Sequence, residues 1–205
     1  MQDLLDFTKE DLINTDELRS KRIFQGHGGH SNEDILNIEK TIGVLPINYK
    51  NKIKEYDFYG KLIGYFSLYP TKDSHEKMAS SLISANTEHG ILSQDFLKEQ
   101  NLICIGSRPD YTVCVARQSK YFNEDQIVLI DDEIFGNENN PRPEDIQVVA
   151  DNIEQFLLII GNLNQLHREV DDDESNYDEK RDEFINRLRI LNVNEKYYDF
   201  WKLLF

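Results

Sequence analysis

Residues 102–130 read LICIGSRPDYTVCVARQSKYFNEDQIVLI. Three short runs of apolar and β-branched residues, a composition typical of strands, lie within this stretch at 102–105, 111–116 and 126–130. Turn-forming residues separate the runs, beginning with the segment GSRPD. Strands that follow one another so closely pair most easily in opposite directions. The stretch therefore predicts an antiparallel meander.

Upstream of the meander, the sequence shows the signals of two helices joined by a tight corner. Ser31 is suited to cap the first helix because Asp34 follows three positions later, and Gly43 ends that helix. Pro46 fits the first turn of the second helix, where its missing N–H is no loss. The pattern predicts two short helices before the first strand.

Between this corner and the meander, the segment LIGYFSLY at 62–69 is rich in aromatic and β-branched residues and predicts one strand. Residues 74–100 return to a helical spacing of apolar residues, which breaks near Gly90. We therefore expect an α+β domain with a mostly antiparallel sheet flanked by helices.

Downstream of the meander, apolar residues at helical spacing predict one long helix over 146–170, which packs on the sheet through Val149, Ile153, Phe156, Leu157 and Ile160. The acidic run 171–183 predicts a solvated hinge. After it, residues 184–205 predict a helix that docks on the main domain or on a second subunit, because its apolar side chains would otherwise stay exposed.

The chain thus divides into an N-terminal extension (1–30), a main domain (31–170), an acidic linker (171–183) and a C-terminal helix (184–205), with helical character expected in both extensions.

The charge balance excludes some classes of partner. The chain has 23 Lys and Arg against 38 Asp and Glu, a net charge of −15. Binding to nucleic acid needs Lys or Arg at each phosphate contact, so we expect a basic protein partner and no nucleic acid. The start MQDLLDFTKED lacks the features of a signal peptide, and no run approaches the roughly 18 apolar residues that span a bilayer. We expect a cytoplasmic protein without membrane contact.

The acidic residues are concentrated in two segments. Residues 131–145 carry six acids and one base, and residues 171–183 carry eight and two, so these 28 positions hold −11 of the net −15. Such clusters are commonly solvated surface. A charge so concentrated also makes a directional field that speeds encounter with a basic surface. On this second interpretation, we expect the partner to bind at Asp131, Asp132, Glu133 and Glu138, the acids that follow the meander.

Metal and catalytic sites find little support. A calcium loop starting at Asp131 would place Gly136 correctly, but Phe135 and Arg142 stand where oxygen ligands are needed. His27 and His30 flank two glycines without further ligands nearby, which favours a solvated turn over a metal site. The common phosphate-binding, zinc-hydrolase and nucleophile-elbow motifs do not occur. We expect no metal, no cofactor and no enzymatic activity, with an enzyme of unrecognised type as a minor alternative.

The two cysteines, Cys104 and Cys114, lie on adjacent extended runs. A hairpin centred near Pro109 would bring them roughly opposite one another. A cross-strand disulfide is conceivable, but without an export signal we expect two reduced, buried thiols.

The order of segments resembles the SUKH superfamily, which includes the yeast cell-wall assembly regulator and many bacterial immunity proteins. The resemblance is carried by IEKTIG with Glu39, LPINYKNKIKEYD, NLICIGSRPDYTVCVA, QIVLIDDEI and VVADNIEQFLLII, and it covers roughly residues 31–165. The glycine-rich turn common after the second helix is reduced here to Gly60, in YDFYGK.

The resemblance implies an α+β domain that binds and neutralises a toxin, commonly a nuclease or deaminase. The charge of the chain points to the same kind of basic partner, because an acidic protein can occupy a nuclease cleft in place of phosphate. The alternative is a housekeeping scaffold of the same fold, for signalling or envelope-assembly partners. The toxin, its target and the oligomeric state stay open.

Overall fold

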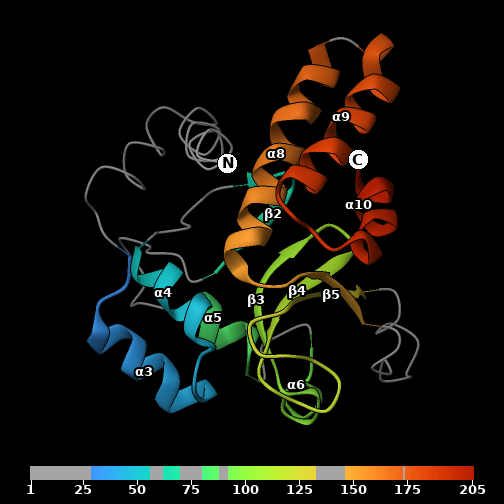
Figure 1. Ribbon diagram of the computed structural model, residues 1–205. Coiled ribbons are helices and arrows are strands. Elements are labelled where there is room, and N and C mark those ends of the chain that lie inside the picture. The colour runs from blue at the N-terminus through green and yellow to red at the C-terminus, as the bar shows by residue number, and fades with distance from the viewer. Residues whose placement is uncertain (1–28, 56–61, 70–79, 88–91, 133–145, 173) are drawn as a thin grey trace.

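The computed structural model describes six stretches of the chain: residues 29–55, 62–69, 80–87, 92–132, 146–172 and 174–205. They form one antiparallel sheet with the strand order β1-β2-β3-β4-β5-β6, flanked by helices (Figure 1). The predicted α+β class and the central meander are confirmed. The strands are β1 (Leu62–Ile63), β2 (Phe66–Leu68), β3 (Leu102–Arg108), β4 (Tyr111–Ala116), β5 (Ile127–Asp131) and β6 (Gln147–Ala150). The helices are α3 (Asn32–Ile42), α4 (Ile47–Glu55), α5 (Ser80–Ala85), α6 (Gln94–Gln100), α8 (Ile153–Asp172), α9 (Tyr177–Ile190) and α10 (Tyr198–Leu204), with 3-10 turns at Glu174–Asn176 and Glu195–Tyr197.

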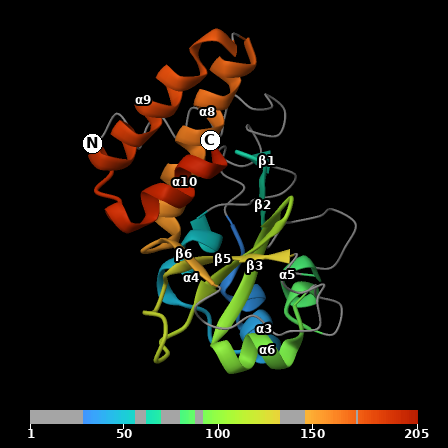
Figure 2. The same ribbon diagram turned by 90° about the vertical axis from the view of Figure 1, so that its right-hand side faces the viewer.

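Both faces of the central strands are covered, which explains why these strands are almost wholly apolar instead of alternating. One face packs against α8 and contributes Ile103, Val113 and Val115 to the larger apolar cluster. The opposite face packs against α6 and contributes Cys104 and Cys114 to a second cluster. Figure 2 shows α6 and α9 at opposite ends of the molecule. The core therefore consists of two layers of side chains, one on each face of the sheet.

The segment 62–69 forms a hairpin and not the single strand predicted from its composition. Strands β1 and β2 pair through Leu62 with Ser67 and Ile63 with Phe66, leaving a two-residue turn. Both turn residues have positive φ, 55° at Gly64 and 69° at Tyr65, as in the tight turns that suit a hairpin. A tyrosine at the second turn position is an uncommon turn signal, so composition alone pointed to a continuous strand.

Residues 147–150 form the edge strand β6, where the sequence predicted the start of the long helix. Helix α8 begins only at Ile153, after Asn152 accepts a hydrogen bond from the backbone N–H of Gln155 (2.9 Å) through its side-chain oxygen. Val149, predicted on the helix face, is buried in the sheet. The β-branched pair Val148–Val149 before a capping residue is the local reason for the strand.

The acidic run 171–183 is largely helical and not the predicted hinge. Helix α8 continues to Asp172, and α9 starts at Tyr177, so the two form a helical hairpin. Asp178 and Glu179 occupy the first turn of α9, where negative charge is favourable beside the helix N-terminus. A run with the composition of a solvated linker thus belongs largely to two helices.

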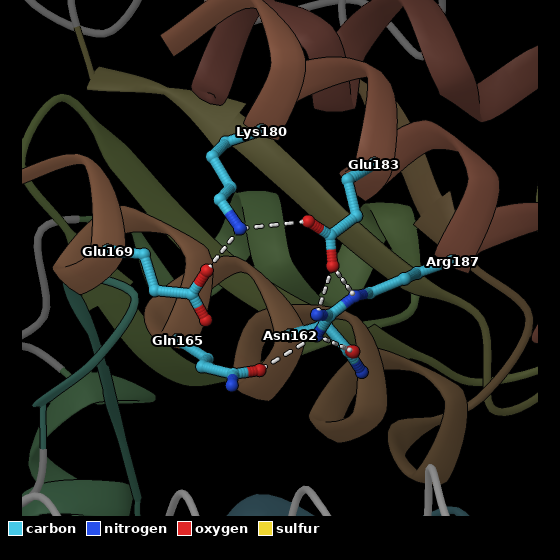
Figure 3. A network of polar contacts seen from close by, with 6 residues as sticks. All are labelled: Asn162, Gln165, Glu169, Lys180, Glu183 and Arg187. Atoms are coloured by element: carbon cyan, nitrogen blue, oxygen red, sulfur yellow. Dashed lines mark hydrogen bonds and ion pairs between the residues drawn. The ribbon is translucent and has the colours of Figure 1, made fainter. Parts of the chain in front are cut away.

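Residues 184–205 dock on the core, as predicted, but as the end of α9 followed by α10. Phe184, Leu188 and Trp201 are completely buried. Polar side chains also join α8 to α9 (Figure 3): the Arg187 guanidinium donates to Asn162 Oδ1 (3.1 Å) and Gln165 Oε1 (2.8 Å). The C-terminal helices therefore share the main apolar cluster with the sheet. None of the described helices has the length and apolar content needed to cross a bilayer.

Candidate functional site

Three aspartates lie where the β3–β4 turn meets the end of β5. Asp110 lies in the turn, Asp131 is the last residue of β5, and Asp132 follows it. We call these three residues the acidic sheet end. Asp110 is exposed, whereas Asp131 and Asp132 are half-buried.

The backbone of the two segments holds the acidic sheet end together. Pro109 and Asp110 form a two-residue turn between the paired residues Arg108 and Tyr111, and Asp110 takes a positive φ of 70°. Asp131 pairs with Tyr111 in the ladder, and the Asp132 N–H donates to the carbonyl of Asp110 (2.9 Å). The three carboxylates therefore lie on a rigid frame of strand pairing.

Asp132 carries its charge at an energetic cost. Burial raises the pKa of its carboxyl above the ordinary value, and the negative charges of Asp131 and Asp110 add to the effect, although a hydrogen bond from Thr112 Oγ1 (2.8 Å) opposes it. Thr112 is itself buried, so this hydrogen bond fixes the orientation of the carboxylate. A cation approaching the three carboxylates would relieve the repulsion between them.

Among the residues that the structure describes, Arg108 is a positive charge near the acidic sheet end. The Arg108 side chain, two positions from Asp110, lies over the ring of Phe66 at 5.3 Å from its centroid. Burial lowers the pKa of the Arg108 guanidinium, while Tyr111 and Asp110 raise it. On the other side, Phe200 of α10 packs edge-on against Tyr111, with centroids 5.9 Å apart. Aromatic side chains thus border the carboxylates.

The structure places half of the predicted site residues and adds one. It brings Asp131 and Asp132 together, while Glu133 and Glu138 lie outside the described residues. Asp110 was missed, because the predicted meander did not fix which residue of the turn around Pro109 meets the end of the strand at 126–130. Asp171 and Asp172, in the second acidic segment, lie in the last turn of α8, which Figure 1 shows at the tip of the helical hairpin, away from the sheet.

The described residues contain no group of three or more metal-ligating side chains placed to hold a metal ion. His30, predicted in a solvated turn, is instead only 2% exposed. Its backbone N–H donates to the carbonyl of Ile53 (2.7 Å). Gly29 explains the tight packing, because a Cβ there would meet the Ile53 carbonyl oxygen at 2.0 Å. His27 lies outside the described residues.

The α3–α4 corner carries a second polar arrangement, built on Glu39. Its carboxylate accepts hydrogen bonds from the Leu45 N–H (3.0 Å) and from Lys50 Nζ (2.8 Å). Burial by itself raises the pKa of Glu39, but the hydrogen bonds from Lys50 and Leu45 outweigh it and hold the pKa below the ordinary value. These contacts are internal, so the Glu39 of the motif IEKTIG organises the corner.

Arg117, at the end of β4, ties the same corner to the sheet. Its guanidinium donates to the carbonyl of Ile42 (2.6 Å), the last residue of α3, and to that of Val44 (2.7 Å), which follows the C-cap residue Gly43. Gly43 lies between them with a φ of 90°, and a Cβ there would meet Arg117 Nη2 at 2.9 Å. The corner is thus a structural device, and the acidic sheet end is the candidate binding site.

Comparison with known families gives one result. The sequence profile of the SMI1 / KNR4 family (SUKH-1) matches residues 29–159, which run from the residue before His30 into α8. No curated protein matches the chain. The matched region contains the α3–α4 corner and the acidic sheet end, and it stops before α9 and α10.

Proposed function

Because the chain belongs to the SMI1 / KNR4 family (SUKH-1), we propose that it is an immunity protein that binds a basic protein toxin and blocks it without chemistry of its own. The observation that carries the proposal is the acidic sheet end. Three carboxylates on a rigid frame, one of them with a raised pKa, favour the approach of a cationic surface.

The second acidic segment is a weaker candidate because its charges are used within the molecule. Lys180 bridges Glu169 (2.5 Å) and Glu183 (3.1 Å), and Arg181 pairs with Asp178 (2.9 Å). At the acidic sheet end, by contrast, neither Asp110 nor Asp132 forms an ion pair with any residue that the structure describes. We infer that, among the residues that the structure describes, the negative field that a partner meets is strongest at the sheet end.

The partner class follows from this field. A toxin that acts on nucleic acid needs a basic cleft for phosphate, and a nuclease or deaminase would present Lys and Arg to the carboxylates. Attraction between such surfaces accelerates association and is screened beyond about 8 Å at physiological ionic strength. Inhibition would result from occupation of the cleft.

The test first identifies the cognate toxin by pull-down or gene neighbourhood, and then measures its rate of association with this chain at two salt concentrations. Replacing Asp110, Asp131 and Asp132 together by Asn should slow association on the order of tenfold at low salt and flatten its salt dependence. The matched control D178N/E179Q/D182N removes the same charge from the exposed face of α9 and should have a smaller effect.

Equal effects of the two triple variants would show that only the net charge matters and would overturn the proposed site. Tight binding that neither triple variant alters would place the interface on an uncharged face. A chain that does not bind the toxin at all would contradict immunity and favour the scaffold alternative.

A further inference from the structure

Cys104 and Cys114 face each other across β3 and β4, on the side of the sheet covered by α6. They are paired residues in the ladder, and both are buried, with exposed fractions of 5% and 0%. Both are free thiols, and their predicted burial is confirmed. The function proposed above does not use them.

The pairing type at this position follows from the hydrogen bonds of Cys104. Its N–H donates to Asn86 Oδ1 (2.8 Å), and its carbonyl accepts from Asn86 Nδ2 (2.7 Å). In an antiparallel ladder, the N–H and C=O of one residue point to the same side, so Cys104 directs both groups away from β4. The Cys104–Cys114 pair is therefore a non-hydrogen-bonded pair.

This pairing type brings side chains closest together. Its Cα atoms lie about 4.5 Å apart, compared with about 5.5 Å in a hydrogen-bonded pair. A disulfide spans Cα separations of roughly 4.4–6.8 Å. The ladder is regular up to Cys104 and shifts register between Cys104 and Gly106, so Cys104 and Cys114 are directly paired, with the backbone separation typical of a pair that a disulfide can span.

The thiols already interact. Interaction with the Cys114 thiol lowers the pKa of the Cys104 thiol, whereas burial raises the pKa of the Cys114 thiol. Cys104 Sγ also lies 3.7 Å from the carbonyl oxygen of Gly106. Cys104 is thus the more exposed and the more readily ionised member of the pair.

We propose that Cys104 and Cys114 form a dithiol modification site, which closes to a cross-strand disulfide on reaction with a low-molecular-weight disulfide such as oxidised glutathione. The Cys104 thiolate attacks one sulfur of the reagent, the reagent's S–S bond breaks, and one glutathione thiolate leaves. The Cys114 thiolate then attacks Cys104 Sγ and expels the second glutathione. The protein loses two electrons and two protons, which appear in two glutathione thiols.

The pair of thiols, Cys104 and Cys114, lies near the acidic sheet end. Thr112, which shares a face of β4 with Cys114, donates its hydroxyl to Asp132, and the Asp132 charge acts on both thiols. Closure would lock β3 to β4 at the base of the three carboxylates. The chemistry itself does not depend on the proposed function and is measured without a partner.

The test treats the folded, full-length chain with oxidised glutathione and follows its intact mass. We expect the mass to fall by two hydrogen atoms without a retained glutathione, and peptide mapping to join the Cys104 and Cys114 peptides. Cys114→Ser removes the resolving thiol, so this variant should keep one glutathionyl group on Cys104. As a control, the same reagent is applied to the chain unfolded in urea, where both thiols should react.

A register control uses the neighbouring pair Ile103 and Val115. In a C104S/C114S background, I103C/V115C places two thiols in the adjacent hydrogen-bonded pair, where closure should be slower. The proposal is overturned if the folded wild type retains a mixed disulfide, or if it stays unreacted while the unfolded chain reacts. Closure at equal rates in both pairs would overturn the argument from register.

Discussion

Glu39 is a carboxylate whose contacts make its charge stabilising. Its side chain is 12% exposed and holds both Lys50 and the Leu45 N–H. Its pKa in the folded chain is below the ordinary value of 4.5. A lowered folded pKa means that the charge stabilises the fold above pH 4.5 and that this contribution is lost as the pH falls through the folded pKa.

We expect Glu39→Gln to lower the free energy of unfolding by about 1–2 kcal/mol at pH 7, because Lys50 loses its charged partner. Urea unfolding followed by circular dichroism, at pH 7 and again near the lower limit of folding, measures the difference. The two proteins should converge at low pH. A difference that is independent of pH would show that the charge of Glu39 is not the cause.

The charge of Asp132 has the opposite effect on stability to that of Glu39. Its folded pKa is raised by burial and by its acidic neighbours, so ionisation destabilises the fold above that pKa and stability is regained as the pH falls through it. Asp132→Asn keeps an acceptor for Thr112 and should make the chain slightly more stable at pH 7, with no difference at low pH. A loss of stability at pH 7 would contradict the cost assigned to this charge.

At the scale of elements, Arg187 links α9 to α8 through polar side chains. Arg187 donates to Asn162, which is completely buried and also donates to the carbonyl of Leu158 (2.7 Å). Removing the guanidinium leaves Asn162 Oδ1 without this donor inside the hairpin (Figure 3). The hydrogen bonds from Arg187 to Gln165 and Glu183 are lost as well.

We expect Arg187→Met to cost about 2 kcal/mol in the free energy of unfolding. The matched control is Arg181→Met on the same helix. Its partner Asp178 is 85% exposed, and an exposed ion pair contributes at most about 1 kcal/mol. Urea unfolding of both variants compares them. Equal losses would show that the network in the hairpin adds nothing beyond a surface ion pair.

The elements that the sequence predicted are those whose local signals agree with their packing. Ser31 and Asp34 form the capping box that the spacing suggested, and the runs at 102–105 and 111–116 became strands. Val149 was assigned to the wrong element, because β-branched residues before a helix fit either a helix face or an edge strand. The distinction depends on β5, whose Val128 pairs with Val148.

The site was half predictable for a similar reason. Asp131 and Asp132 are adjacent to a predicted strand, so sequence reasoning could find them. Asp110 joins them through the pairing of Tyr111 with Asp131 and through the hydrogen bond from the Asp132 N–H to the Asp110 carbonyl, contacts between residues 20 or more positions apart. The register of that pairing is set by the packing of both sheet faces, and a single sequence does not display it.

At the scale of the whole molecule, the net charge of −15 opposes compaction. Raising the ionic strength so that the Debye length falls from about 30 Å to about 8 Å should raise Tm, because repulsion between the acidic segments is screened. The D110N/D131N/D132N variant should respond less. Calorimetry at the two ionic strengths measures both, and a Tm that falls with added salt would contradict self-repulsion as the dominant effect.

Trp201, the only tryptophan of the chain, lies at the joint between the C-terminal helices and the sheet. Its indole N–H donates to the carbonyl of Val149 (2.9 Å), and the rings of Phe66, Phe156 and Phe184 surround it. Val149 lies inside the family match, whereas Trp201 lies outside it. Tryptophan fluorescence, excited at a wavelength where the tyrosines do not absorb, therefore reports on this joint. An emission maximum that shifts to longer wavelength before the sheet unfolds would show α10 leaving the core, with no added label.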